Sequence, residues 1–372
     1  MATSERSSLR RSSDVLIRSV LPVVLALIVG AFILIALGKN PLTFYGGIID
    51  NGISGGNWQN SMVMMGPLLI MAVALIVVFR GALWNLGYDG QYLLGAVVVM
   101  GFGPTLMQYM PAGLAIVIVT IGAMAVGAIW TIPNSWLKAR YGTNEIITTL
   151  VMSTIGVGVA NILIKQLFQD PTVVTPQTRE IPLNSMLPYI PGTQVNIGFI
   201  VAIVAAIVFQ VLLTRTAFGL HLDIYGANPK AALHIGINPR RMTIVLFLIS
   251  GGLIALAASM DMLGQWGYLR ANWNPSYGNA ILPFVFLARL SPIVSIPFIA
   301  FYSVFATGGT IASQTSGLSV DFLQVIVALI LVFMTITEYV GTKRDLGESY
   351  LPDELKVMFQ RPFAAFTRRT RT

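Results

Sequence analysis

Long apolar runs recur along this chain and are separated by shorter polar stretches. A helix needs roughly 20 apolar residues to cross a bilayer, and most of these runs approach that length. We therefore predict an all-α integral membrane protein. The uninterrupted runs that we expect to span are Ser19–Gly38, Ser61–Phe79, Gln91–Gly103, Ala112–Pro133, Ile146–Lys165, Ile197–Leu213, Thr243–Met262 and Phe322–Tyr339.

One further apolar stretch, residues 278–306, is interrupted by Arg289-Leu290-Ser291-Pro292. Read as one helix, it gives nine spans and places the basic C-terminal tail outside. Read as two short spans that turn at Arg289, it gives ten spans and two cytoplasmic termini. Basic residues favour the cytoplasmic side of a membrane. The ten-span topology places all 23 Lys and Arg residues there except Lys39, Lys165, Arg179 and Arg270, so we adopt it.

This topology divides the chain into three parts. Residues 1–18 form a polar, basic cytoplasmic tail, and residues 342–372 form a second tail with a possible short amphipathic helix at Asp353–Phe359. The transmembrane domain, residues 19–341, includes an external proline-rich loop at 166–196. A signal peptide has a shorter apolar region, roughly 7 to 15 residues, so we expect the first span to remain uncleaved. No fixed-period repeat is visible.

Composition supports a membrane protein and narrows its partners. The chain is 55% hydrophobic and 10% charged, whereas a soluble domain carries about 25% charged residues. The net charge of +8 lies mainly in the termini and alternate loops, so no folded basic face is expected to bind nucleic acid. Absence of cysteine excludes disulfides and thiolate sites.

The polar link at residues 223–241, DIYGANPKAALHIGINPRRM from Asp223 to Met242, is the longest charged connection in the middle of the chain. Apolar positions recur at helical spacing within it, which predicts a short amphipathic helix. Asn228-Pro229 supplies a start signal and Asn238-Pro239 a stop. A short, ordered cytoplasmic helix in a membrane protein suggests a docking point for a partner. The residues that we expect to act there are Asp223, Asn228, Lys230, Ala231, Ala232, Gly236, Ile237 and Arg240.

Polar residues interrupt the membrane region at Arg80–Gly95, which reads RGALWNLGYDGQYLLG. Irregular backbone at membrane depth is tolerated only where it is buried in protein or lines a water-filled cavity. An ordinary cytoplasmic loop is the alternative. We expect four side chains of this stretch to line a translocation path: Asn85, Tyr88, Asp89 and Gln91.

Two further stretches each admit two interpretations. In Tyr141–Thr149, Gly142 can end one helix and Thr143 or Asn144 can cap the next, with Glu145 near the favourable helix dipole; the alternative places Asn144 and Thr148 on the path. In Trp266–Tyr277, the aromatic residues suit interfacial anchoring, or Trp266 flanks the entrance for a ring-shaped solute.

The small residues between Ser250 and Ser259 predict a close helix-packing face. No phosphate-binding loop or dinucleotide motif is present, and His221 and His234 lack metal-ligand spacing. We therefore predict a non-catalytic protein that binds no cofactor or metal itself.

Four motifs together resemble one family. GANPKAALHIGINPRR at Gly226–Arg241 has the A-A-x-x-x-G-I core of the coupling segment in permease subunits of prokaryotic ABC importers, the group that includes branched-chain amino acid, ribose and nucleoside systems. NLGYDGQYLLGA at Asn85–Ala96 is similar to the N-x-G-x-[ED]-G-Q pattern of the nucleoside (simple sugar-like) branch. KARYGTNEIITTL at Lys138–Leu150 also resembles that branch. The fit at Tyr277–Pro292 is looser, because Pro283 and Phe284 replace small residues.

The resemblance implies about ten spans in a prokaryotic plasma membrane. It also implies an ATP-binding subunit that carries ATP and Mg²⁺, a second permease subunit, identical or different, and an extracytoplasmic substrate-binding protein. The solute is expected to be a nucleoside or a related ribose-containing compound. The alternatives are another sugar or a branched-chain amino acid and, in a different class, a self-sufficient secondary transporter or channel.

Overall fold

The computed structural model describes the backbone of residues 2–345 and the side chains of residues 18–344. Within that part every regular element is a helix, and the β-structure consists of isolated bridges. The all-α fold class is therefore confirmed. The chain divides into two compact units, one formed by residues 34–324 and one by residues 1–33 with 325–372. Each unit is described by itself.

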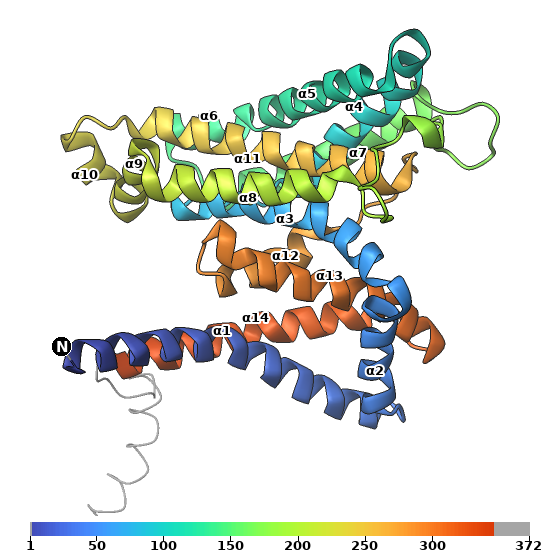
Figure 1. The fold of residues 1–372 in the computed structure, drawn as a ribbon. Helices are drawn as coiled ribbons and strands as arrows, with labels where there is room; N and C mark the ends of the chain where they lie inside the picture. Colours follow the sequence, from blue (N-terminus) through green and yellow to red (C-terminus); the bar gives the residue numbers. More distant parts are fainter. Residues whose placement is uncertain (1, 346–372) are drawn as a thin grey trace, which may run out of the picture. The chain divides into compact units, whose positions relative to one another are not determined.

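The helices follow one another along the sequence as Figure 1 labels them. The α-helices are α1 (Ala2–Ala36), α2 (Pro41–Gly52), α3 (Trp58–Arg80), α4 (Tyr88–Tyr109), α5 (Ala112–Trp130), α6 (Ile132–Tyr141), α7 (Glu145–Gln166), α8 (Ile197–Arg215), α9 (Ala217–Ala227), α10 (Pro229–His234), α11 (Pro239–Asp261), α12 (Tyr277–Leu287), α13 (Pro292–Thr315) and α14 (Phe322–Asp345). Short turns of other helix types are η1 (Ser54–Gly56), η2 (Leu183–Ser185) and the π-helical η3 (Met262–Trp266).

Within the described residues, nine helical segments are long and apolar enough to cross a membrane, and α12 is a shorter apolar helix. These segments match the predicted spans, with two differences at their ends. Helix α4 begins at Tyr88 and reaches Tyr109, so the run predicted from Gln91 to Gly103 was too short. Helix α1 begins at Ala2, so residues 2–18, predicted as a tail, continue the helix. The predicted helix at Asp353–Phe359 lies outside the described residues.

The interrupted stretch is two helices that turn at Arg289, as predicted, but only α13 is long enough to span a membrane. Helix α12 ends at Leu287, α13 begins at Pro292, and the turn between them holds Arg289 and Leu290 at φ values of 50° and 54°. Helix α12 has 11 residues, which at 1.5 Å per residue spans about 16 Å, or half of a hydrocarbon core of about 30 Å. It therefore cannot cross a membrane alone.

Close contacts between small residues hold the centre of the 34–324 unit together. A Cβ atom added to Gly127 would lie 2.4 Å from the carbonyl oxygen of Gly251, and one added to Gly95 would lie 2.8 Å from the Ala255 Cβ. These contacts bring α5 and α4 against α11. The packing face predicted at Ser250–Ser259 is confirmed, and it lies within the chain. Tight approach of this kind is the main source of helix association in lipid.

The external loop predicted at residues 166–196 has little regular structure. Its η2 turn and isolated bridges are its only regular features among described residues, and one bridge joins Gln177 to Arg270. Backbone hydrogen bonds from Thr178 and Ile181 to the carbonyls of Leu269 and Gly267 fix the loop on the segment after η3. The loop is thus compact, as its prolines indicated.

An internal repeat is present, although none was visible along the sequence. Two short segments share the pattern A-x-W-N-x-x-Y, and each directly precedes or enters a helix that begins at its tyrosine. The matching pairs are Ala82 and Ala271, Trp84 and Trp273, Asn85 and Asn274, and Tyr88 and Tyr277. In both copies the asparagine Oδ1 accepts a hydrogen bond from the backbone N–H two residues later, at 3.1 Å in the first and 3.0 Å in the second.

The two copies run in opposite directions. Helix α3 precedes the first copy and ends near α9, whereas α11 precedes the second copy and begins near α10 (Figure 1). The helices that begin at Tyr88 and Tyr277 therefore start inside the unit and diverge. Inverted repeats with discontinuous helices of this kind are characteristic of transporters. Four identities in a short, inverted segment are too weak a signal to find without the fold.

A second pair of segments belongs to the same repeat. Each segment contains G-x-N-P, whose proline begins a short helix, and a G-I pair further on. The first segment is Gly38–Ile48 and leads into α2, and the second is Gly226–Ile237 and includes α10. Each asparagine caps its helix, with Asn40 accepting from Leu42 N at 2.9 Å and Asn228 accepting from Lys230 N at 3.0 Å. Helices α2 and α10 lie at opposite ends of the unit (Figure 1). We call the end that carries α9 and α10 the coupling end.

Candidate coupling segment and translocation path

The polar link at residues 223–241 forms a helical elbow. Helix α9 ends at Ala227, Asn228 caps α10, and α10 ends at His234. The chain then turns through Gly236, whose φ of +87° favours glycine. Asn238-Pro239 starts α11, since Asn238 Oδ1 accepts hydrogen bonds from the N–H groups of Arg240 and Arg241. The prediction of a stop signal there was wrong, because an Asn-Pro pair also caps a following helix.

The elbow presents an apolar surface at an otherwise polar end of the protein. Leu233 and Ile235 are 61% and 60% exposed, and Leu220 of α9 is 61% exposed. Ala232 and Ile237 face inward, at 0% and 8% exposed. Neighbouring exposed apolar side chains indicate a protein contact. We define Leu233 and Ile235, at the end of α10, as the elbow surface; the sequence reading did not single out Leu220 or Leu233.

The predicted coupling residues therefore have different roles in the structure. Ala231, Lys230 and Arg240 are exposed beside the elbow surface. Ala232, Ile237 and Gly236 shape the elbow from within or at its turn, and Asn228 caps α10. Of the predicted coupling residues, only Ala232 and Ile237 are buried and therefore cannot contact a partner directly.

Asp223 connects the elbow to α3. The Arg80 guanidinium donates to both Asp223 carboxylate oxygens, from Nε to Oδ1 at 2.9 Å and from Nη2 to Oδ2 at 2.7 Å. Bidentate pairs fix geometry more strongly than single contacts. A Cβ atom on Gly226 would lie 2.2 Å from the Arg80 carbonyl oxygen, so only glycine permits this approach. The ion pair and this close backbone contact together join the elbow to the end of α3.

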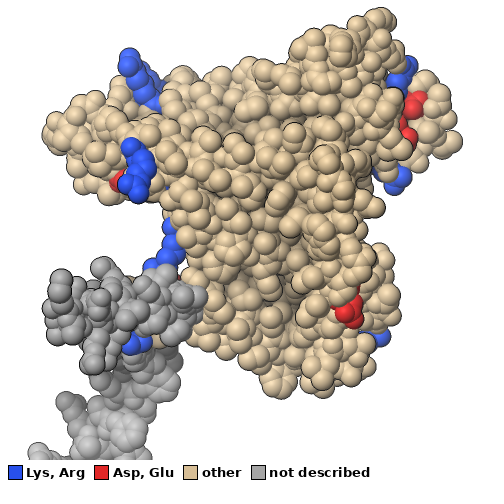
Figure 2. All heavy atoms as spheres, in the orientation of Figure 1, with Lys and Arg blue, Asp and Glu red and all other residues tan. Residues whose placement is uncertain are grey.

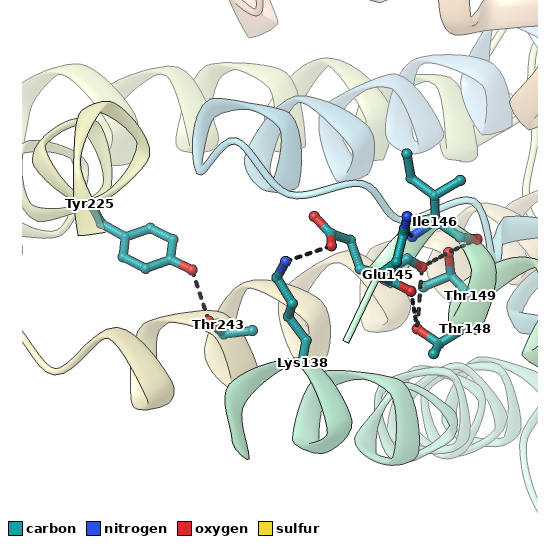
Figure 3. Close-up of polar contacts among 8 residues, drawn as sticks. Lys138, Glu145, Ile146, Thr148, Thr149, Tyr225 and Thr243 are labelled. Carbon is teal, nitrogen blue, oxygen red and sulfur yellow. Dashed lines mark hydrogen bonds and ion pairs between the residues drawn. The ribbon is translucent and has the colours of Figure 1, made fainter. Parts of the chain in front are cut away.

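A polar cluster lies next to the elbow (Figure 3). Lys138 Nζ of α6 and Glu145 Oε2 of α7 form an ion pair at 2.7 Å, with the Glu145 side chain 10% exposed. Tyr225 of α9 and Thr243 of α11 share a hydrogen bond of 2.8 Å. Burial raises the pKa of Tyr225, which keeps its hydroxyl protonated. These contacts tie α6 to α7 and α9 to α11.

Asn144 and Gly142 act as the capping interpretation expected. Gly142, at φ +66°, ends α6, and Asn144 Oδ1 accepts a hydrogen bond from Ile146 N at 2.9 Å. Asn144 itself is exposed. The Thr148 hydroxyl donates to its own helix, at 3.3 Å from the Asn144 carbonyl. Capping therefore accounts for these contacts, and a role on the path remains a prediction.

Thr149, the last residue of the Tyr141–Thr149 stretch, connects α7 to the irregular segment 81–87. It is 0% exposed, donates to the Glu145 carbonyl at 2.6 Å and accepts from Leu86 N at 3.2 Å. A single threonine hydroxyl can both donate and accept. The T-T pair at residues 148 and 149 gives no sequence signal for which hydroxyl faces the protein.

Asn85 and Gln91 form a closed polar pair inside the unit. Each amide donates to the carbonyl oxygen of the other at 3.0 Å, and Asn85 Nδ2 also donates to Ser250 Oγ of α11 at 2.9 Å. Their exposed fractions are 0% and 1%. These two side chains are thus buried in protein, and neither reaches open space in this conformation.

Tyr88 and Asp89 lie where the two discontinuous helices meet. The Tyr88 hydroxyl donates to Asn279 Oδ1 of α12 at 2.5 Å. A Cβ atom on Gly278 would lie 2.2 Å from the Tyr88 ring, so α4 and α12 touch at their first turns. Asp89 is half-buried beside this contact. Among the described residues, no group of three or more His, Asp or Glu side chains gathers to hold a metal.

Trp266 lies away from these residues, in η3. Its ring lines a cavity of about 470 Å³ at the end of the unit opposite the coupling end. The cavity also contacts α3 and α13. The structure therefore separates the predicted path residues into four places: a closed pair at Asn85 and Gln91, the α4–α12 contact, the start of α7 with Asn144 and Thr148, and this cavity.

Comparison with known proteins identifies the family. A family model described as "Branched-chain amino acid transport system / permease component" matches residues 57–335, which is most of the 34–324 unit. The chain belongs to this family. The match includes the irregular segment, the elbow and α12, so the site elements described in this subsection lie within the permease component.

Several relatives are permeases of ABC transporters. The glucose ABC transporter permease protein TsgB13 of Haloferax volcanii is 28% identical over 332 residues, covering 86% of this chain and 87% of the relative. The nucleoside ABC transporter permease protein NupB of Lactococcus lactis is 28% identical, covering 84% and 89%. The guanosine permease NupP of Bacillus subtilis is 27% identical, covering 70% and 75%. No solved structure matches.

The chain is therefore an ABC importer permease, a multi-pass protein of the prokaryotic plasma membrane. Membership implies an ATP-binding subunit and a substrate-binding protein as partners. As a transporter permease subunit, it is a non-catalytic component of the complex. The recognition made from the four sequence motifs is confirmed.

Proposed function

We propose that this permease imports a nucleoside or a related ribose-containing solute. An extracytoplasmic binding protein delivers the solute, and a partner subunit that binds ATP and Mg²⁺ drives transport. Two permease subunits, identical or different, form the path. The coupling end faces the cytoplasm, together with both termini, as the positive-inside distribution of Lys and Arg favours.

The similarity to permeases named for nucleosides and guanosine supports this solute class. Those two relatives align with 84% and 70% of the chain. The N-x-G-x-[ED]-G-Q pattern at Asn85–Gln91 points to the same branch, and in the structure its first and last residues form the closed amide pair. The first and last residues of the pattern thus form a buried contact with each other and are not exposed on the surface.

The contacts of the elbow support an ATP-coupled mechanism. Nucleotide binding by the partner subunits would move the elbow surface, and the Arg80–Asp223 pair would pass the movement to α3. Helix α11 begins directly after the elbow, so a second helix moves with it. Hydrolysis would then reset the pair of permeases and return the path to its first orientation.

A hexose is the second candidate, because a glucose permease is similar over 86% of the chain. Both candidates are uncharged. In Figure 2 the charged side chains of residues 34–324 gather at the two ends of the unit, and the middle of the drawn face carries none. A highly charged solute would need fixed countercharges inside the membrane, so this distribution favours a neutral solute.

Competition for uptake tests the solute class. In proteoliposomes with the complete importer, a tenfold excess of unlabelled guanosine should reduce labelled-uridine uptake about tenfold, because a competitor of equal affinity then occupies about nine-tenths of the sites. Glucose and leucine at the same excess should leave uptake unchanged. Inhibition by glucose alone would assign the hexose, and inhibition by leucine alone would contradict both candidates.

A further inference from the structure

The cavity that Trp266 lines has the size of a small-molecule site. Its volume is about 470 Å³, within the range of about 300 to 1,000 Å³ that is usual for such sites. Its wall comes from the first turns of α3, from η3, from the start of α12, from the second half of α13 and from the first residues of α14. All of the lining residues belong to the 34–324 unit.

The lining combines aromatic rings with uncharged hydrogen-bonding groups. Three rings, three amides and two hydroxyls contribute, and no Lys, Arg, Asp or Glu is present in the lining. These residues are Trp266, Tyr277, Tyr302, Asn60, Gln265, Gln324, Thr307 and Thr310. A sugar ring has apolar faces that pack on aromatic rings and hydroxyls that pair with amides, and a nucleoside adds a base that stacks. An ion would find no countercharge.

Each of the three cavity aromatics is supported from behind by another aromatic ring. Trp266 packs edge-on against Trp273 at 5.0 Å between ring centroids, and Tyr277 packs in the same way against Tyr92 at 5.7 Å. Tyr302 packs against Phe284 at 5.2 Å. Rotamers locked by a second layer of side chains are what a binding site requires.

A buried carboxylate lies in the same second layer. Asp261, the last residue of α11, is 1% exposed and accepts a hydrogen bond from the Tyr92 hydroxyl. The Trp266 and Tyr277 side chains also interact with this carboxylate. Because the Trp266 indole N–H is turned toward Asp261, Trp266 presents its ring to the cavity. One buried carboxylate thus orients two of the three cavity rings.

The cavity is also connected to the coupling end. Helix α3 runs from Asn60 in the cavity wall to Arg80, which pairs with Asp223. Helix α11 runs from the elbow to η3, where Gln265 and Trp266 line the cavity. A movement of the elbow therefore displaces two walls. In the first copy of the repeat the side chain of Asn85 is buried, whereas the corresponding side chain in the second copy, Asn274, is exposed.

We propose that this cavity is a solute subsite of the permease, which receives a neutral hydroxylated ring from the binding protein before the path reorients. This proposal rests on the proposed function, and it identifies where the permease first contacts the solute. Sugars and nucleosides share the chemistry that it recognises, a ring with an apolar face and several hydroxyls.

Single thiols test the proposal, because the chain contains no cysteine. Thr310→Cys places a thiol in the cavity wall. Thr105→Cys is the matched control in a second cavity, of about 380 Å³, which Arg179 also lines. The variant chains are reconstituted with cysteine-free partner subunits and labelled with a membrane-impermeant maleimide. Uridine, glucose and leucine are added in separate arms without binding protein.

We expect uridine or glucose to slow labelling of Thr310→Cys and to leave Thr105→Cys unchanged. At four times the Kd, labelling should slow about fivefold, because one site in five is then free. The arm that protects identifies the solute, and leucine should not protect. Equal labelling with every solute, or reaction only with a lipid-soluble reagent, would overturn the subsite. ATP-driven uptake by the same preparations distinguishes this failure from failure of the proposed function.

Discussion

Replacing both Leu233 and Ile235 by glutamate is expected to abolish ATP-driven uptake. These side chains are 61% and 60% exposed on the elbow, so the folded permease should tolerate the change. In a complex, burial of each is worth about 1.5 to 3 kcal/mol. Loss of about 3 kcal/mol or more corresponds to at least a hundredfold weaker assembly. Co-purification of the ATP-binding subunit with the permease measures the effect directly.

Leu183→Glu is the matched control for this prediction. Leu183 is an exposed leucine as well, at 85%, but lies in η2 of the external loop. It should leave co-purification of the ATP-binding subunit unchanged. Normal assembly of the Leu233→Glu/Ile235→Glu variant would show that the elbow surface is not the docking site. Ala232→Arg is a less direct test, because Ala232 is 0% exposed and an arginine there would disturb the elbow itself.

Asn85→Leu is expected to destabilise the permease by about 3 to 5 kcal/mol. The substitution leaves the buried Gln91 amide, the Ser250 hydroxyl and the Gly87 N–H without their partner. Each unsatisfied buried group costs about 1 to 3 kcal/mol, and some of this cost is relieved by local rearrangement. Denaturant unfolding of the detergent-solubilised protein, followed by tryptophan fluorescence, measures the change in free energy.

Asn274→Leu provides an internal control from the second copy of the repeat. Asn274 makes the same turn hydrogen bond, from Ser276 N at 3.0 Å, but its side chain is exposed. Its replacement should cost about 1 kcal/mol or less. Equal losses at the two positions would contradict the conclusion that the buried contacts of Asn85 with Gln91 and Ser250 stabilise the fold.

The membrane-spanning helices were readable from sequence because apolar length and charge distribution act locally. The break at Arg289 is an example. A lone arginine followed by Leu-Ser-Pro has a local cost in an apolar helix, and the structure places two left-handed residues, Arg289 and Leu290, at that point. The capping roles of Gly142, Asn144 and Asn228 were equally local. Each depends on the residue type and its immediate neighbours.

The site was less predictable because its contacts join distant segments. Nothing near Arg80 or Asp223 indicates that they pair across 143 positions. The closure of Asn85 depends on Ser250 of another helix, and the cavity depends on three aromatic pairs from different elements. The inverted repeat was missed for a related reason, since its two copies share a few residues and acquire opposite directions only in the fold.

ATP-driven accumulation of solute tests the central claim most directly. Labelled uridine uptake is measured in proteoliposomes that contain this chain, its ATP-binding subunit and a partner permease, with loaded binding protein outside and ATP inside. Our account predicts accumulation above the external concentration, lost when ATP is omitted or when Leu233→Glu/Ile235→Glu replaces the native chain. Equal uptake by this chain alone, without ATP or partners, would contradict it and establish a self-sufficient transporter.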